Sequence, residues 1–151
     1  MAARMSNAAW VLPGAFEALQ ALNAATEDCG VPASTLALSH LRASQINGCN
    51  ACIEGGCYTA RKAGETDERL AAVAEWREAP YFTDAERAAL ALTEAATRLA
   101  DQQDAVPDEI WDEATRHYDE KAMGGLLLTI ALANFYNRLN VPIRQETANW
   151  G

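Results

Sequence analysis

Residues from about 119 to 139 restrict the fold most, because they are apolar on nearly every side of an expected helix. Large apolar side chains recur there without leaving a polar face, at Met123, Leu126, Leu127, Leu128, Ile130, Leu132 and Phe135. A helix of this kind lies at the centre of a core, or between a core and a subunit interface. Gly124 and Gly125 within it would let another backbone approach closely.

The rest of the chain also shows apolar residues at helical spacing. The expected helices cover residues 13–29, 33–46, about 48–63, 66–80, 83–99 and 107–118. Thr83 and Glu86 have the spacing of a capping box at the start of one of them. No stretch predicts a strand or an internal repeat, and half of the 151 residues are hydrophobic. We therefore expect an all-α fold in which six to eight helices pack as a bundle around one core.

The charge balance and the short apolar stretches restrict the partners. Twelve basic and twenty-one acidic residues give a formal net charge of -9, which repels nucleic-acid phosphates and anionic membranes. The longest apolar stretch, residues 122–133, is too short to span a bilayer, and residues 8–12 are too short for a signal-peptide core. We expect a cytoplasmic protein with no nucleic acid and no membrane as partner. The acidic segment 101–120 is expected to be a solvated face.

Three of the four cysteines lie within nine residues, and two of them form the pair Cys49-Asn-Ala-Cys52. Asn47-Gly48 predicts a turn, after which a helix would begin with Cys49 in its first turn. Exposed N–H groups and the positive end of the helix dipole favour a thiolate there, so this argument makes Cys49 the more reactive thiol. Cys52 lies one turn later on the same face. In a reducing compartment such a pair suits reversible disulfide chemistry better than permanent cross-linking.

The sequence around this pair closely resembles the signature of the alkyl hydroperoxidase D-like, carboxymuconolactone decarboxylase-like superfamily. The resemblance extends over roughly residues 13–140 and rests on Leu41-Arg-Ala-Ser-Gln-Ile-Asn-Gly-Cys-x-x-Cys-Ile53, Ala60-Arg61, Ala63-Gly-Glu-Thr66, Trp76-Arg-Glu78, Phe82-Thr83, Glu86-Arg-Ala-Ala-Leu-Ala-Leu-Thr-Glu94 and Asn137-Arg-Leu139. It implies a single all-α domain over residues 1–151 that assembles into homotrimers or homohexamers. It also implies thiol peroxidase or disulfide reductase chemistry on a hydroperoxide or disulfide substrate. In the family, the residue matching Cys52 attacks, the residue matching Cys49 resolves the sulfenic acid, and an external thiol reduces the disulfide.

The sequence departs from the family pattern at the residues that transfer protons. The family's relay glutamate stands twelve residues before the first cysteine, where this chain has Ala37. Its relay histidine stands four residues after the second cysteine, where this chain has Gly56. The missing relay predicts weak or altered peroxidase activity. Because the family's choice of Cys52 depends on that relay, we give more weight to Cys49 as the reactive thiol.

His40 is a candidate substitute for the missing relay. It lies three residues after Ala37 on one face of an expected helix, and Ser44 lies four residues further along that face. A histidine placed there could serve as the base for the thiols. The alternative is a surface histidine, or a core histidine with its hydrogen bonds satisfied.

Cys57 is about 80° round a regular helix from Cys49, so it does not share the face of the pair. It could resolve an oxidised partner, pair across a subunit boundary, or be buried and inert, and we expect the last. Gly55-Gly56 would either loosen the helix, at about 1 kcal/mol for each glycine relative to alanine, or leave space beside the thiols. Cys29, at a helix end, is expected to be structural.

A zinc site would have to combine Cys49, Cys52 and Cys57 with His40 or His117. Zinc sites usually have a second, well-spaced pair of ligands, and this chain has none. We therefore expect no metal. We also expect no cofactor, because the chain has neither a phosphate-binding loop nor a haem-attachment motif.

Three functional hypotheses remain. The first is a thiol–disulfide oxidoreductase of the alkyl hydroperoxidase kind that uses the CxxC pair for antioxidant chemistry. The second is a non-peroxidase member of the fold, which serves as an oligomeric binding or redox-sensing protein. The third is acid–base chemistry on a small organic acid. It is the weakest, because no pair of carboxylates or histidines has an obvious place near the cysteines.

Overall fold

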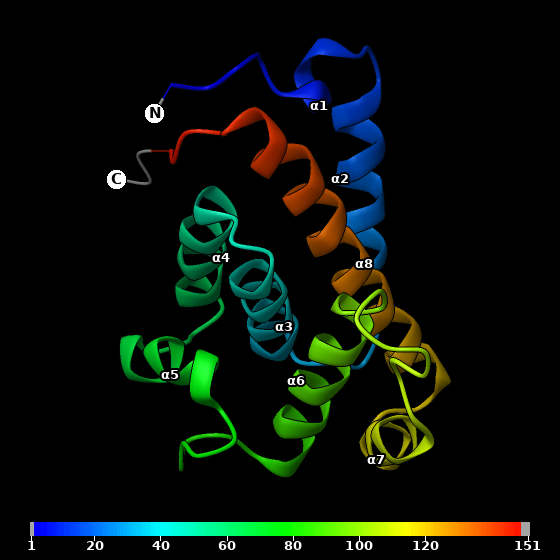
Figure 1. Ribbon diagram of the computed structural model, residues 1–151. Coiled ribbons are helices and arrows are strands. Elements are labelled where there is room, and N and C mark those ends of the chain that lie inside the picture. The colour runs from blue at the N-terminus through cyan, green and yellow to red at the C-terminus, as the bar shows by residue number, and fades with distance from the viewer. Residues whose placement is uncertain (1, 149–151) are drawn as a thin grey trace.

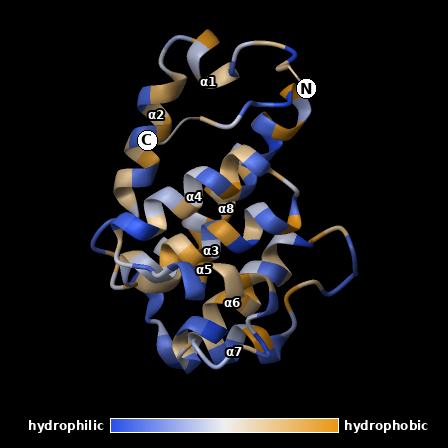
Figure 2. Cartoon of the chain, turned by 90° about the vertical axis from the view of Figure 1, so that its left-hand side faces the viewer, coloured by the Kyte–Doolittle hydropathy of each residue, from blue (hydrophilic) through white to orange (hydrophobic). Residues whose placement is uncertain are grey.

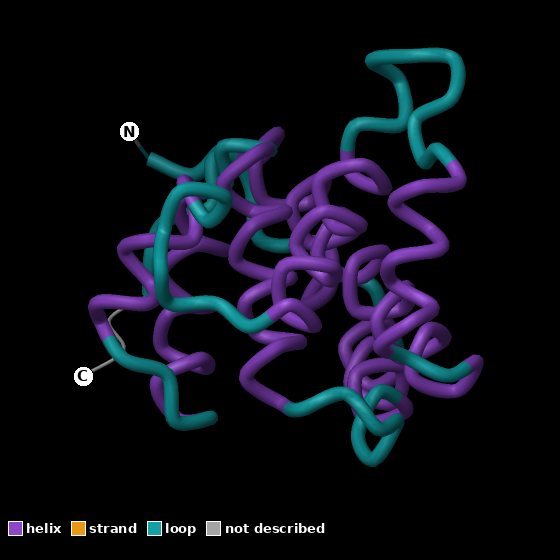
Figure 3. Tube along the Cα trace, turned by 90° about the horizontal axis from the view of Figure 1, so that it is seen from below, coloured by secondary structure: helices purple, strands orange, loops and turns teal. Residues whose placement is uncertain are grey.

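The computed structural model describes residues 2–148. Those residues form eight α-helices and one short 3-10 helix, and none of them is in a strand (Figure 3). The elements are α1 (Ala8–Val11), α2 (Ala15–Ala25), α3 (Ala33–Ile46), α4 (Asn50–Lys62), α5 (Asp67–Ala72), η1 (Val73–Glu75), α6 (Asp84–Thr97), α7 (Asp108–His117) and α8 (Glu120–Ile143). The predicted all-α fold of six to eight helices is confirmed.

Helix α8 is the central element of the bundle. It packs against α3 and α4 on one side and α2 on the other, and it also contacts α6 and α7 (Figure 1). Its residues Leu126, Ile130 and Ala133 are almost fully buried, whereas Phe135 on another side is exposed. The helix continues to Ile143, beyond the expected end near residue 139. Within the described residues no helix is both long and apolar enough to cross a membrane.

The buried side chains form two clusters. One lies between α6, α7 and α8 and includes Leu92, Tyr118 and Leu126. The other lies between α3, η1 and α6 and includes Leu41 and Trp76. Figure 2 shows the most hydrophobic stretches on the inner helices of the molecule, while the connecting loops carry many hydrophilic residues. Helix α3 contacts both clusters and also packs against α4, the helix that carries Cys52.

A buried carboxylate also ties these helices together. Glu94 of α6 accepts hydrogen bonds from Arg42 Nε at 3.0 Å, from Trp76 Nε1 at 2.8 Å and from Arg77 Nη1 at 2.9 Å. The contacts therefore join α3, α6 and the turn after η1. Arg42, Arg77 and Glu94, which belong to the segments that carry the family resemblance, thus stabilise the fold through these ion pairs.

Two further helices differ from expectation. The helix expected over 13–29 begins only at Ala15, because Gly14 before it has a φ of 84° that no helical residue adopts. The helix expected over 66–80 divides into α5 and η1, with Thr66 as its predicted cap. The capping box of Thr83 and Glu86 is present as predicted.

The close approach expected at Gly125 comes mainly from a side chain. The residue makes room for Cys29, whose Sγ would overlap a Cβ added at position 125, and the Thr26 carbonyl oxygen would lie 3.9 Å from that Cβ. Cys29 is free and only 4% exposed, so it packs as a small apolar residue. At Gly124 an added Cβ would meet nothing within 4 Å.

Candidate redox site at the start of α4

Cys49 and Cys52 are joined by a disulfide bond at the start of α4, with their Cα atoms 5.2 Å apart. Helix α4 begins at Asn50, so Cys49 is its N-cap and not a residue of its first turn. The Sγ atom of Cys49 accepts the Cys52 N–H at 3.3 Å, which satisfies one of the free donors at the helix start. Gly48 before it has a φ of 67°, a conformation that favours glycine in this tight turn.

The two cysteines differ in their access to the outside. Both are buried, with 2% exposure for Cys49 and 6% for Cys52. Cys52 lines a cavity of about 1110 Å³, whereas Cys49 is not among the residues that line it. Cys52 is therefore the residue of the pair that a molecule in the cavity would contact. The position at the helix start favoured Cys49, whereas access from the cavity favours Cys52.

The walls of this cavity come from α2, the connection from α2 to α3, α3, α4 and α8. Apolar residues from α3 and α8 form much of the surface, among them Leu36, Ala37, Leu132 and Ala133. The connection from α2 to α3 contributes polar residues, and α4 contributes Cys52 and both glycines of the pair Gly55-Gly56. Helix α4 is continuous through these glycines. This fits the interpretation that they leave space beside the thiols better than the interpretation that they loosen the helix.

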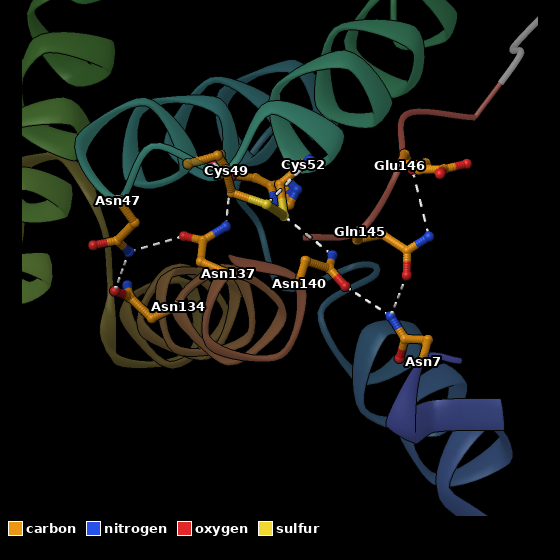
Figure 4. The surroundings of a disulfide bond; sticks show 11 residues. Asn7, Asn47, Cys49, Cys52, Asn134, Asn137, Asn140, Gln145 and Glu146 are labelled. Atoms are coloured by element: carbon orange, nitrogen blue, oxygen red, sulfur yellow. Dashed lines mark hydrogen bonds between the residues drawn. A yellow bond between two sulfur atoms is a disulfide. The ribbon is translucent and has the colours of Figure 1, made fainter. Parts of the chain in front are cut away.

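Asn140 of α8 donates a hydrogen bond from Nδ2 to Sγ of Cys52 at 3.3 Å (Figure 4). The direction of this amide is fixed through a second asparagine. Asn7 Oδ1 accepts the Ala9 N–H, so Asn7 Nδ2 must be the donor to Asn140 Oδ1 at 2.7 Å. With its oxygen committed to Asn7, Asn140 presents its NH₂ group to the sulfur. The N-terminal segment therefore orients a donor at the disulfide.

A second group of asparagines supports the turn before Cys49. Asn47 Nδ2 donates to Oδ1 of both Asn134 and Asn137 on α8, each at 2.9 Å. Asn137 is 1% exposed and donates from Nδ2 to Ser44 Oγ at 3.1 Å (Figure 4). Ser44 in turn donates to the carbonyl of His40, and its own carbonyl accepts the Cys49 N–H. Ser44 thus supports the backbone and does not line the cavity.

The sequence argument missed these α8 side chains as a group. Their positions, Asn134, Asn137 and Asn140, recur every three residues in an otherwise apolar helix. That spacing places polar groups along one side of a buried helix, which is the signal that could have indicated them.

His40 lies in the cavity wall, as do Ala37 and Gly56, which replace the relay residues of the family. A Cβ added at Gly56 would lie 3.5 Å from Cδ2 of His40, so the imidazole occupies the space next to the missing relay histidine. Its ring also meets the edge of Tyr136, with 6.5 Å between ring centroids. Burial lowers the pKa of His40 to about 4, so the ring is neutral at pH 7. The base role stays a hypothesis, and a neutral ring of this pKa gives a thiolate little electrostatic support.

Cys57 and His117 do not line the cavity. Cys57 is half-buried and free, and it packs against the cluster around Leu41 and Trp76. Burial raises the pKa of the Cys57 thiol. His117 Nε2 contacts Glu113 Oε1 at 3.1 Å on α7. In the part of the chain that the structure describes, no three histidine, cysteine or acidic side chains are grouped so that they could hold a metal ion.

Comparison with known proteins places the chain among related sequences. The sequence model of the carboxymuconolactone decarboxylase family matches residues 13–95. The uncharacterised protein YdfG of Bacillus subtilis is 31% identical over 139 residues, which cover 92% of this chain and 93% of YdfG. The uncharacterised protein YnjA of Escherichia coli is 34% identical over 100 residues, which cover 66% of this chain and 53% of YnjA.

Solved structures share the architecture. A protein of unknown function from Agrobacterium tumefaciens, suggested to be the antioxidant defence protein AhpD, superposes with a TM-score of 0.88 at 28% identity. The match covers 98% of this chain and 99% of that protein. The debrominase Bmp8 superposes with a TM-score of 0.79 at 23% identity over 90% of this chain and 72% of its own. The likeness to Bmp8 shows a common fold.

Proposed function

The chain belongs to the carboxymuconolactone decarboxylase family, and from this we propose that it is a CxxC thiol–disulfide oxidoreductase that reduces an organic hydroperoxide. The observation that carries the proposal is the position of Cys52. Its sulfur is bonded to Cys49 and accepts a hydrogen bond from Asn140, and the residue lines a large cavity. These are the features that a thiol needs in order to meet a substrate and then be resolved by a neighbour.

The reaction would proceed in three balanced steps. The Cys52 thiolate attacks one peroxide oxygen, so that an S–O bond forms, the O–O bond breaks and the alcohol leaves after it takes up a proton. Cys52 is then a sulfenic acid. The Cys49 thiol attacks that sulfur, the disulfide forms and water leaves. An external dithiol supplies two electrons and two protons, which restores both thiols and converts the donor into its disulfide.

The residues around the pair would have separate roles. Asn140 would stabilise the Cys52 thiolate, because a hydrogen bond to a charged acceptor is stronger than one to a neutral acceptor. Cys49 would be the resolving thiol, held at the helix start by the Cys52 N–H. Ala37 and Gly56 supply no proton relay. Since a positioned acid or base contributes roughly 10²- to 10⁴-fold, turnover should be slow by about that factor relative to a protein with the full relay.

Peroxide consumption with a dithiol donor tests the proposal directly. Cys52→Ser should abolish turnover, and Cys49→Ser should stop the cycle at the sulfenic acid, which a dimedone adduct on Cys52 would report. Cys57→Ser is the matched control, because that thiol does not line the cavity. Its turnover should equal that of the wild type. Turnover that persists in Cys52→Ser would refute the proposal.

The missing relay favours one other candidate, a redox-sensing protein of the same fold. Such a protein would form and lose the Cys49–Cys52 disulfide reversibly but would not turn over peroxide. No peroxide consumption in the wild type, with a disulfide that still forms and is reduced by dithiol, would support the sensor.

A further inference from the structure

We propose that the cavity at Cys52 is a charge-selective site that admits neutral, largely apolar molecules and rejects carboxylates. This names the substrate class and rests on the proposed function for the chemistry at the sulfur. The class would include aryl or branched alkyl hydroperoxides that carry no acid group.

The charges around the cavity support this selectivity. Among the residues that the structure describes, no lysine or arginine lines it, and the charged residues in its wall are Glu27 and Asp28. Both are exposed, so they stand where the cavity meets solvent. His40, the remaining residue in the wall that could become cationic, is neutral at pH 7 because burial lowers its pKa to about 4. An anionic molecule would therefore meet two negative charges and no positive side chain.

The dipole of α3 acts in the opposite direction but is weaker. Its first turn contributes Pro32 and Ala33 to the wall, and a helix N-terminus is equivalent to roughly half a positive charge. Two full carboxylate charges outweigh it. A carboxylate about 6 Å from a monoanion in a water-like medium lowers the occupancy of that anion roughly threefold, and two such carboxylates lower it about tenfold. Salt would reduce the effect, because the Debye length is about 8 Å at physiological ionic strength.

The walls also indicate the character of the ligand. Leu36, Leu132 and Ala133 offer apolar contact, and a cavity of about 1110 Å³ has room for a molecule larger than hydrogen peroxide. The hydroxyl oxygen of Tyr136 accepts a hydrogen bond from the Asn23 amide, which holds this side chain in the wall. Burial of apolar surface against the walls would supply most of the affinity.

Alkylation of Cys52 tests the inference without requiring peroxidase turnover. Iodoacetamide and iodoacetate are nearly equal in size and differ by one negative charge. The rates at Cys52 are measured by peptide mass mapping in a reduced Cys49→Ser protein at low salt. The ratio of the two rates is then divided by the same ratio for the chain unfolded in urea. We expect a normalised preference for iodoacetamide of about tenfold, falling toward threefold at physiological salt.

Charge variants identify the cause. Glu27→Gln with Asp28→Asn should reduce the preference to less than threefold. Glu109→Gln with Asp112→Asn is the matched control, since it removes two exposed charges on α7 that do not line the cavity. It should leave the preference unchanged. A normalised ratio near one, or a ratio that the Glu27 and Asp28 changes do not reduce, would overturn the inference.

Turnover measurements separate this inference from the proposed function. Cumene hydroperoxide and its para-carboxylate would be compared with a dithiol donor. A preference for iodoacetamide, without turnover of either peroxide, would refute the proposed peroxidase function but would still support the charge selectivity. Turnover of both peroxides at equal rates, with unbiased alkylation, would refute the selectivity and leave the peroxidase standing.

Discussion

Asn140 on α8 holds its amide NH₂ group 3.3 Å from Sγ of Cys52 on α4. The contact joins residues 88 positions apart in the chain. Asn7 fixes the direction of the amide, and Asn7 is itself held by a backbone N–H and by Gln145. The segment before α1 therefore orients the donor at the Cys52 sulfur through one intermediate side chain, so the effects of Asn7 and Asn140 can be measured separately.

Replacement of Asn140 by leucine should raise the pKa of the Cys52 thiol by about one unit, because a hydrogen bond to a charged acceptor is worth about 1.5–3 kcal/mol and water would replace part of it. The measurement is the ultraviolet absorbance of the thiolate against pH in a Cys49→Ser background. Asn7→Ala should give a smaller shift in the same direction. Asn23→Ala changes an asparagine that lines the cavity without contacting the sulfur, and it should leave the titration unchanged. If the titration curve of the Asn140→Leu protein superposed on that of the parent, Asn140 would not stabilise the Cys52 thiolate.

His40 should make the protein less stable as pH falls from 6.5 to about 4. The unfolded chain takes up a proton near pH 6.5, whereas the folded chain does so only near pH 4, because burial lowers the pKa of His40. The unfolded state thus binds more protons in this window, so stability rises with pH there. The total effect is about 3 kcal/mol or less. Urea unfolding at several pH values should show it, and His40→Phe should remove the slope between pH 6.5 and 4.5. If the free energy of unfolding of His40→Phe still fell as the pH fell in this window, groups other than His40 would be responsible.

Glu94 should stabilise the fold above pH 4.5 and lose that contribution as pH falls further. Burial alone would raise the pKa of this carboxyl, but hydrogen bonds from Arg77, Trp76 and Arg42 lower it below its ordinary value of 4.5. Glu94→Gln leaves Arg42 without its charged partner and should cost about 3 kcal/mol at pH 7. The loss should shrink in acid, where the wild-type carboxyl is also protonated. Glu109→Gln, which changes an exposed glutamate on α7, serves as the control in the same denaturant titrations.

Two adjacent glycines on α8 should respond in opposite ways to alanine. Gly125→Ala would force a Cβ against Sγ of Cys29 and should destabilise the fold by about 1–3 kcal/mol. Gly124→Ala adds a Cβ where nothing lies within 4 Å, so it should be neutral or stabilise by up to about 1 kcal/mol. Cys29→Ala should recover much of the loss in the Gly125→Ala protein. Equal thermal midpoints for the two alanine variants would show that the Cys29 contact is not restrictive.

The sequence by itself determined the features that depend on neighbours along the chain. The apolar spacing predicted α3 at its observed bounds, and the hydroxyls of Thr66 and Thr83 predicted two helix starts. The spacing of Cys49 and Cys52 predicted a pair that could bond, and they are joined in the structure. Each of these follows from residues within about one helical turn, so the local backbone geometry is sufficient to decide them.

Only the tertiary structure decided how the two sulfurs differ. Access for Cys52, the donor on Asn140 and the imidazole beside Gly56 depend on how α3, α4 and α8 lie against one another. The same dependence explains why the nearest neighbour of Gly125 is the side chain of Cys29. Helical spacing states which face a residue occupies, but it does not state which neighbour covers that face. That choice is made by the packing of residues far apart in the chain, which carries no local signal.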